Sequence, residues 1–325
     1  CLLFLLPKDV LMQSIFILFI VATLAACNVL AQQPISGMQS PEGASGYVEK
    51  KDVISKKFMV AAANPFATDA GYQILKEGGS AIDAVIATQM VLNLVEPQSS
   101  GIGGGAFLMH FDGNKVTAFD GRETAPSDVN EKLFQTEDGT PMRFYEAVVG
   151  GRSTGAPGVL RMLEMAHKQY GKLPWSALFV AAIKLAEEGF PVSHRLHTLL
   201  ASEKYLKADS EAAHYFYDAQ GAPRPVAYIL KNPEFARVLR DIAAGGADAF
   251  YAGRIAKEIA QKVRSHATNP GTLSSTDIEA YQAKLREPLC SDYKKWTVCG
   301  MPPPSSGGIG VAQMLSMLET KEMER

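Results

Sequence analysis

The residue of this sequence best suited to bind a small anion is Arg122, near the end of the stretch SSGIGGGAFLMHFDGNKVTAFDGRETAP at 99–126. A guanidinium group can hold a carboxylate through two parallel hydrogen bonds, a geometry that a lysine cannot reproduce. Asp120 and Glu123 lie beside it in the sequence, and a surface ion pair with one of them is the simpler explanation. Arg122 is therefore a candidate carboxylate-binding residue, and an ordinary surface arginine is the leading alternative.

The glycines before this arginine raise the question of a nucleotide site. Gly101, Gly103 and Ala106 match the spacing GxGxxA of dinucleotide-binding loops. That pattern needs a strand before it and a helix after it, so that the phosphates meet the helix N-terminus. Here the predicted order is reversed, and no Lys-Ser or Lys-Thr pair completes a P-loop. We therefore expect the glycines to let the backbone pass close to another segment or a ligand.

A second candidate for chemistry is GRSTG at 151–155, which fits the GxSxG pattern of a nucleophile elbow. It follows FYEAVVGG at 144–151, which we predict as a strand. An elbow also needs a helix directly after the serine, whereas the turn residues 156–158 come next. The sequence offers these histidines as partners: His194, His197, His214 and His266. His194 and His197 lie three residues apart, but no nearby carboxylate or cysteine completes a metal site.

Composition limits the class of protein. Of the 325 residues, 47% are hydrophobic and 20% are charged, which is enough apolar material for a sizeable core. The formal net charge of −2 leaves no basic surplus to neutralise a phosphate backbone. We therefore expect a globular protein with no nucleic-acid partner.

The first residues resemble an export signal. The apolar run at 14–26 has the length of a signal peptide and is short for a membrane span. LAAC at 24–27 fits a lipoprotein signal that would lipidate Cys27, and VLA at 29–31 fits an ordinary cleavage site. We expect a signal peptide or lipoprotein leader at 1–31 and a polar tether at 32–56. The protein would then be exported, periplasmic or secreted, with membrane contact only through a lipid anchor.

The elements around Arg122 must place it at the end of a hairpin. Two β-rich runs flank Asp112-Gly113-Asn114 and predict this hairpin, and two helices are predicted before it within 64–97. The second helix begins with Ser80 and Asp83, spaced as in a capping box. Most of 158–284 has helical periodicity. This order of elements predicts an α+β fold in which the helices are segregated from an antiparallel sheet.

A last hairpin is predicted at 288–299, and it contains the two cysteines that lie outside the leader. A two-residue turn at Lys294-Lys295 would set Cys290 directly opposite Cys299. A cross-strand disulfide is one outcome, and two independent half-buried thiols are the other.

Taken together, these segments resemble the γ-glutamyltransferase family (γ-glutamyltranspeptidase, glutathione hydrolase). The matching pieces run in the family's order from about residue 60 to 319: GGSAIDAVIATQMVLNLVEPQSSGIGGGAF, FDGRETAP, GAPG, GKLPWSALFVAAIKLAEEGF, AFYAGRIAKEIA and MPPPSSGGIG. As a set they are far more specific than any single motif above.

The resemblance implies an N-terminal-nucleophile hydrolase fold, a four-layer αββα sandwich, made as a proenzyme that cleaves itself. Cleavage would expose a threonine at the start of a small subunit. Its hydroxyl attacks the γ-glutamyl amide of glutathione and related amides, and the acyl group passes to water or an amine. No cofactor or metal is implied. Arg122 falls on the arginine of the family's DGRETAP motif, which grips the substrate α-carboxylate, and GRSTG falls on a turn.

The resemblance also implies that this chain is only part of the proenzyme. Its sequence stops before the Thr-Thr-His type segment that carries the nucleophile, so we expect 57–325 to be a large-subunit region with no catalytic residue of its own. The small subunit of the same proenzyme would be its partner, and the chain alone would be inactive. Two alternatives share these features: an amidase of the cephalosporin-acylase or poly-γ-glutamate-processing type, and an inert exported fragment or binding lipoprotein.

Overall fold

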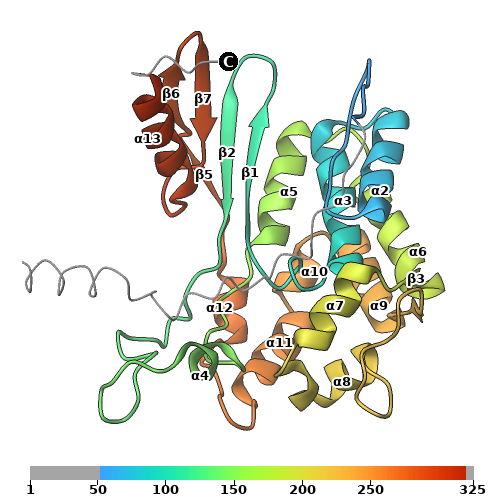
Figure 1. The fold of residues 1–325 in the computed structure, drawn as a ribbon, viewed down its shortest axis with the longest axis vertical. Coiled ribbons are helices and arrows are strands. Elements are labelled where there is room, and N and C mark those ends of the chain that lie inside the picture. The colour runs from blue at the N-terminus through green and yellow to red at the C-terminus, as the bar shows by residue number, and fades with distance from the viewer. Residues whose placement is uncertain (1–51, 320–325) are drawn as a thin grey trace, which may run out of the picture. The chain divides into compact units, whose positions relative to one another are not determined.

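The computed structural model describes residues 52–319 (Figure 1). The predicted leader with its Cys27, and residues 32–51 of the predicted tether, lie outside the described residues. Within the described part, no helix is both long enough and apolar enough to cross a bilayer.

The first two helices form as their local signals predict. Helix α2 (Pro65–Lys76) is capped by Asn64, whose side chain accepts a hydrogen bond from the amide of Phe66. Helix α3 (Ala81–Val95) opens with the predicted capping box of Ser80 and Asp83. Because α3 is apolar on most sides, it is buried among α2, α5 and α6. It ends just before the glycine-rich loop.

The hairpin that carries Arg122 consists of β1 (Ala106–Phe111) and β2 (Val116–Gly121), paired antiparallel. Its turn is stabilised by Asp112, whose side chain accepts hydrogen bonds from two turn amides, and by Gly113, whose φ is 101°. The other edge of β2 pairs with β5 (Lys284–Arg286), which gives the strand order β1-β2-β5. Helix α5 (Val159–Tyr170) packs against β2.

One predicted strand is wrong. Residues Phe144–Val148 form a short helix, α4, with only Ala147 buried. None of the strands in residues 52–319 pairs with this segment. Instead, the side-chain amide of Asn269 donates to the carbonyl oxygens of Glu146 and Val149, at 3.0 and 2.8 Å. A tertiary contact therefore satisfies carbonyl groups that a sheet would otherwise have bonded.

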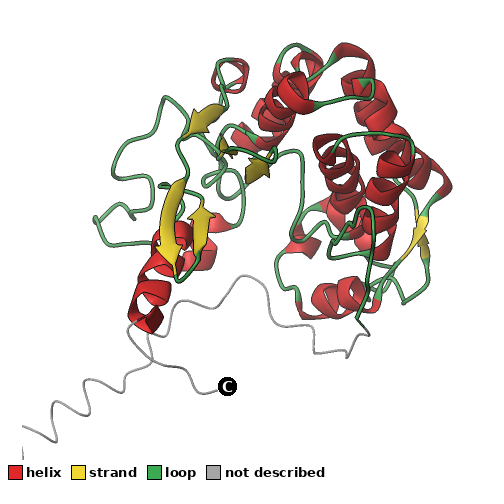
Figure 2. Cartoon of the chain, turned by 90° about the horizontal axis from the view of Figure 1, so that it is seen from above, coloured by secondary structure: helices red, strands yellow, loops and turns green. Residues whose placement is uncertain are grey.

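Helices dominate the remainder of the chain, as predicted. Its elements are η1 (Trp175–Phe179), α6 (Val180–Glu188), β3 (Phe190–Pro191), α7 (His194–Ser202), η2 (Leu206–Ala208), α8 (Ser210–Phe216), β4 (Ile229–Leu230), α9 (Pro233–Gly245), α10 (Asp248–Tyr251), α11 (Arg254–Arg264) and α12 (Ser275–Glu279). Figure 2 shows most of these helices gathered to one side of the longer strands. They bury one continuous apolar core that reaches Phe119 of β2.

The last elements are the hairpin β6 (Leu289–Tyr293) and β7 (Trp296–Gly300) and helix α13 (Gly307–Glu319). The predicted two-residue turn is confirmed, because Tyr293 pairs with Trp296 and Cys290 pairs with Cys299. The two cysteine Cα atoms are 4.0 Å apart and their sulfurs are bonded in the structure. Helix α13 packs on this hairpin but buries none of its own described side chains.

Candidate functional site

Arg122 directly follows β2, and its backbone is held on both sides. Its amide donates to Oδ1 of Asp120 at 2.8 Å, and its carbonyl oxygen accepts from the hydroxyl of Tyr281 at 2.8 Å. The backbone of the arginine is therefore fixed where the strand ends.

Asp120 is itself held in place by the neighbouring strand. It is 5% exposed, and its second oxygen, Oδ2, accepts from Nε of Arg286 on β5 at 2.7 Å. Both carboxylate oxygens are thus bonded to groups other than the Arg122 side chain. Asp120 was one of the two acidic neighbours considered as an ion-pair partner. It accepts a hydrogen bond from the backbone amide of Arg122 and does not pair with the guanidinium group.

The guanidinium group of Arg122 contacts the other neighbour. Its Nη1 lies 3.1 Å from Oε2 of Glu123, and 63% of the Arg122 side chain stays exposed. An exposed ion pair of this kind contributes about 0–1 kcal/mol, so a ligand carboxylate could compete with it or share the fork. The surface ion pair that the sequence suggested therefore forms with Glu123, and the rest of the guanidinium surface stays accessible to a ligand.

Two residues of the glycine-rich loop, Gly104 and Gly105, pack against the start of α5 and against Glu123, the neighbour of this arginine. The carbonyl oxygen of Gly104 accepts from the amides of Gly158 and Val159, at 2.9 and 3.1 Å, and so caps the N-terminus of α5. A Cβ on Gly105 would lie 2.5 Å from Oε2 of Glu123. The predicted close approach is thus confirmed at Gly105, whereas at Gly103 no heavy atom lies within 4 Å of an added Cβ.

A second close approach brings the end of β2 onto α5. A Cβ on Gly158 would lie 2.2 Å both from the carbonyl oxygen of Gly121 and from the hydroxyl oxygen of Tyr281. Only glycine fits at this position without displacing the strand or the tyrosine. The sequence placed Gly158 in a turn but gave no sign of what it faces.

The GRSTG segment is a turn and not a nucleophile elbow. A helix, α4, precedes it in place of a strand, and α5 begins only at Val159. The hydroxyl of Ser153 donates to the carbonyl oxygen of Val148 at 3.2 Å. The carbonyl oxygen of Asn269 accepts from the amide of Gly151 at 2.8 Å and fixes the turn.

The histidines considered as partners have other roles. Nδ1 of His197 lies 2.9 Å from the carbonyl oxygen of Arg224, and Nδ1 of His266 accepts from the amide of Asn269. His194, at the first position of α7, is exposed. Among residues 52–319, no group of three or more His, Cys, Asp or Glu side chains is placed to hold a metal ion.

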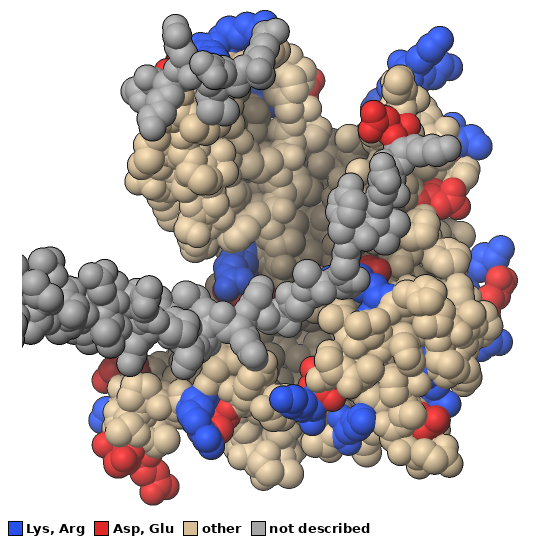
Figure 3. Space-filling model, viewed as in Figure 1, with Lys and Arg blue, Asp and Glu red and all other residues tan. Residues whose placement is uncertain are grey.

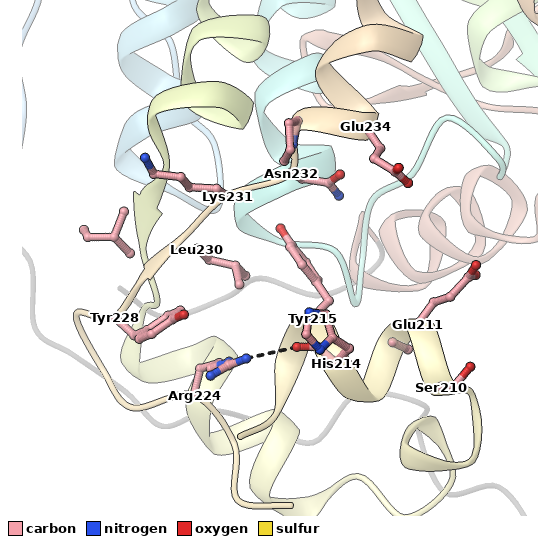
Figure 4. Close-up of a pocket in the computed structure, with 13 residues that line it drawn as sticks. Ser210, Glu211, His214, Tyr215, Arg224, Tyr228, Leu230, Lys231, Asn232 and Glu234 are labelled. Carbon is pink, nitrogen blue, oxygen red and sulfur yellow. Dashed lines mark hydrogen bonds between the residues drawn. The ribbon is translucent and has the colours of Figure 1, made fainter. Parts of the chain in front are cut away.

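A pocket of about 1040 Å³ lies elsewhere, between α8 and the start of α9 (Figure 4). Arg224 donates to the carbonyl oxygen of His214 there, and the hydroxyl of Tyr215 points toward Asn232. Burial raises the pKa of Tyr215 to about 12. The pocket shares no lining residue with the Arg122 cluster and has charges of both signs, so we place the functional site at Arg122 on chemical grounds.

Two residues of the Arg122 cluster were missed by sequence reasoning, Tyr281 and Arg286. Both come from the segment around β5, more than 150 positions along the chain from the residues they bind. The sequence predicted neither that β5 exists nor that β5 pairs with β2. No other feature of the sequence indicates that Tyr281 and Arg286 lie near Arg122.

Comparisons with known proteins agree with the resemblance. The γ-glutamyltranspeptidase family model matches residues 67–325. Glutathione hydrolase proenzyme of Bacillus subtilis strain 168 is 38% identical over 276 residues, which cover 84% of this chain and 46% of that protein. The chain thus spans about half the length of this relative.

Two solved structures resemble the fold of this chain. The γ-glutamyltranspeptidase of Helicobacter pylori superposes with a TM-score of 0.80 at 29% identity, covering 84% of this chain and 78% of the other. A cephalosporin acylase from Bacillus halodurans superposes with a TM-score of 0.74 at 28% identity, covering 89% and 54%. These likenesses confirm the predicted α+β fold of the N-terminal-nucleophile hydrolase class. The chain belongs to the γ-glutamyltranspeptidase family.

Proposed function

We propose that this chain supplies the substrate-carboxylate clamp of an enzyme that transfers or hydrolyses the γ-glutamyl group of glutathione and related amides. The observation that carries the proposal is Arg122, whose backbone is fixed on both sides while 63% of its side chain is exposed. A fixed, open guanidinium suits a small carboxylate ligand, which it can bind through two hydrogen bonds.

The chemistry of bond cleavage would come from another part of the proenzyme. In the γ-glutamyltransferase family, which this chain resembles, a threonine at the start of the small subunit forms the acyl-enzyme. Arg122 would hold the α-carboxylate and so place the γ-amide carbon where that threonine can attack. Its contribution is then binding and orientation, without any proton transfer.

Exposed apolar side chains support a small subunit as the partner. On α13 these include Ile309, Val311 and Met314, and on β1 the side chain of Phe111 is 63% exposed. Figure 3 shows few charges on the surface over β6, β7 and α13. Apolar patches of this kind are typical of surfaces that another polypeptide covers.

Export of the protein is proposed on the sequence alone. The apolar run at 14–26 supports a signal peptide and a periplasmic or secreted location, and LAAC at 24–27 supports a lipid anchor on Cys27. Labelling cells with a palmitate analogue, with Cys27→Ser as the control, separates the two forms of leader. Label that depends on Cys27 indicates the lipoprotein, and its absence indicates the ordinary signal peptide.

An acylase with the same fold is the second candidate, because the chain also superposes on a cephalosporin acylase. Both functions would use Arg122, because a glutaryl amide carries its carboxylate as far from the scissile amide as a γ-glutamyl amide does and lacks only the α-amino group. A γ-glutamyl substrate has its α-carboxylate at a fixed distance from the scissile amide, and so do the γ-linked units of poly-γ-glutamate. Comparing glutathione, a poly-γ-glutamate oligomer and a glutaryl amide as substrates distinguishes these functions.

The test uses Arg122→Lys and Arg122→Ala in the proenzyme that contains this chain. Lysine keeps the charge but loses the paired geometry, and alanine loses both. Because charge-assisted hydrogen bonds contribute about 1.5–3 kcal/mol each, we expect kcat/KM for γ-glutamyl-p-nitroanilide to fall at least about tenfold for lysine and further for alanine. Self-cleavage into subunits, followed on a gel, should stay at the wild-type level. Processing that fails in step with activity would make Arg122 a structural residue, and unchanged kinetics would refute its proposed role.

A further inference from the structure

The side chain of Tyr281 reaches Arg122 from a distant part of the chain. Its hydroxyl donates to the carbonyl oxygen of Arg122 at 2.8 Å, across 159 positions of sequence. Tyr281 lies between α12 and β5 and is 5% exposed. Its ring is stacked on that of Tyr251, with centroids 5.9 Å apart and planes 18° from parallel. The orientation of the hydroxyl is therefore set by packing.

The space that the hydroxyl occupies exists because residue 158 is glycine. A Cβ on Gly158 would lie 2.2 Å from the hydroxyl oxygen of Tyr281. Any larger residue there would force the tyrosine away from Arg122, or push α5 away from β2. The N-cap of α5, the end of β2 and the segment before β5 thus meet around one hydrogen bond.

The hydroxyl of Tyr281 is protonated at neutral pH and can donate this hydrogen bond. Burial raises the pKa of Tyr281 to about 12, and the nearby carboxylates of Asp120 and Glu123 raise it in the same direction. The carbonyl oxygen of Arg122 can only accept a hydrogen bond, so the direction of this bond is fixed.

We infer that Tyr281 is a positioning residue for Arg122, an inference that rests on the function proposed above. Asp120 holds the amide of Arg122 and Tyr281 holds its carbonyl oxygen, so together they fix the direction in which the Cα–Cβ bond leaves the backbone. The long side chain of Arg122 magnifies any tilt of that bond at its guanidinium end. Small displacements of a substrate-positioning group are costly because the reacting atoms must meet in a narrow geometry.

The experiment is a double-mutant cycle in the proenzyme that contains this chain, with Tyr281→Phe made both in the wild type and in Arg122→Ala. Loss of one hydrogen bond should lower kcat/KM for γ-glutamyl-p-nitroanilide about two- to tenfold in the wild-type background, with a lower kcat as well as a higher KM, because a displaced Arg122 also misplaces the amide carbon. In the Arg122→Ala background the same change should cost less than about twofold, because Tyr281 acts only through Arg122.

The matched control is Tyr170→Phe. The hydroxyl of Tyr170 also contacts β2, at Oγ1 of Thr117, with the two oxygens 3.2 Å apart, but far from Arg122 along the strand. We expect this variant to leave kcat/KM within about twofold of the wild type. A loss of kcat/KM equal to that of Tyr281→Phe would show that any tyrosine hydroxyl in contact with β2 affects activity, and would overturn the inference.

A second variant keeps the inference testable if Tyr281→Phe folds poorly. Replacement of Tyr281 by 4-aminophenylalanine keeps an N–H donor at the same place, and it should restore kcat/KM to within about twofold of the wild type. Failure of this rescue, or equal losses in the two backgrounds of the cycle, overturns the inference alone. A wild-type proenzyme without γ-glutamyl turnover, or an Arg122→Ala variant as active as the wild type, contradicts the proposed function and the inference with it.

Discussion

The close packing of Gly105 against Glu123 gives a prediction that can be measured on this chain by itself. The change is Gly105→Ala. Its new Cβ would lie 2.5 Å from Oε2 of Glu123 and 2.7 Å from the carbonyl oxygen of Gly121. The carboxylate could rotate aside, but the carbonyl oxygen belongs to the backbone of β2, where Gly121 pairs with Ala106. The loop or the strand must therefore shift.

The size of the effect follows from two opposing contributions. Overpacking of this kind costs about 1–3 kcal/mol, and replacing glycine by alanine recovers about 0.4–1 kcal/mol by restricting the unfolded chain. We expect a net destabilisation of about 1–2 kcal/mol, which lowers the melting temperature by about 2–8 °C for a domain of this size. In the proenzyme, the shifted Glu123 should also raise KM for γ-glutamyl substrates.

Gly103→Ala is the matched control. It lies two positions earlier in the same loop, an added Cβ would have no heavy atom within 4 Å, and its φ is not in the left-handed region. We expect its melting temperature to equal or slightly exceed that of the wild type. Differential scanning calorimetry of both variants is the assay. Equal melting temperatures for the two variants would refute the packing of Gly105 against Glu123 and β2.

Three further predictions concern other parts of the chain. Protein purified without reductant should have Cys290 bonded to Cys299, so alkylation before and after reduction should give intact masses that differ by one label on each cysteine; identical masses would contradict the bond. Asp277→Asn should lower stability at neutral pH by about 0.5–2 kcal/mol, because Asp277 forms the capping box of α12 and accepts from the amide of Ser127. Burial alone would raise the pKa of Asp277, but hydrogen bonds from Ser274 and Ser127 outweigh burial and hold it far below its usual range. The stability that Asp277 contributes is therefore present above its unfolded pKa of about 3.9 and is lost as the pH falls toward its folded pKa. The difference in melting temperature between Asp277→Asn and the wild type should thus narrow below about pH 4. A difference that does not depend on pH would contradict this role of Asp277. The 325-residue chain alone should release no p-nitroaniline from γ-glutamyl-p-nitroanilide, and release above a heat-treated control would show that it contains its own nucleophile.

Local signals in the sequence predicted the elements that position the site. The capping box of Ser80 and Asp83 marked the start of α3, and the residues Asp112-Gly113-Asn114 marked the hairpin that ends at Arg122. Such signals succeed because the groups that stabilise each feature lie within a few positions of one another. The turn at Lys294-Lys295 succeeded for the same reason.

The failures all involve contacts between distant segments. The strand predicted at 144–151 is a helix, whose end and following turn Asn269 holds from more than 100 positions away. Arg286 completes the Arg122 cluster from β5, a short strand that has no local signature, and Tyr281 completes it from the segment just before that strand. The glycine loop was interpreted correctly as a close-approach device, but only the structure shows that Gly105 makes the approach and Gly103 does not. Residue pattern alone cannot indicate which distant backbone a glycine faces.

In the proposed function, Arg122 recognises the α-carboxylate of a γ-glutamyl substrate. The most direct test compares kcat/KM of the wild-type proenzyme for γ-glutamyl-p-nitroanilide with that for its α-carboxamide analogue, which differs only in the group that Arg122 would hold. We expect the carboxylate substrate to be preferred at least about tenfold, and this preference to disappear in Arg122→Ala. Equal kcat/KM values in the wild type, or a preference that survives in Arg122→Ala, would contradict the claim.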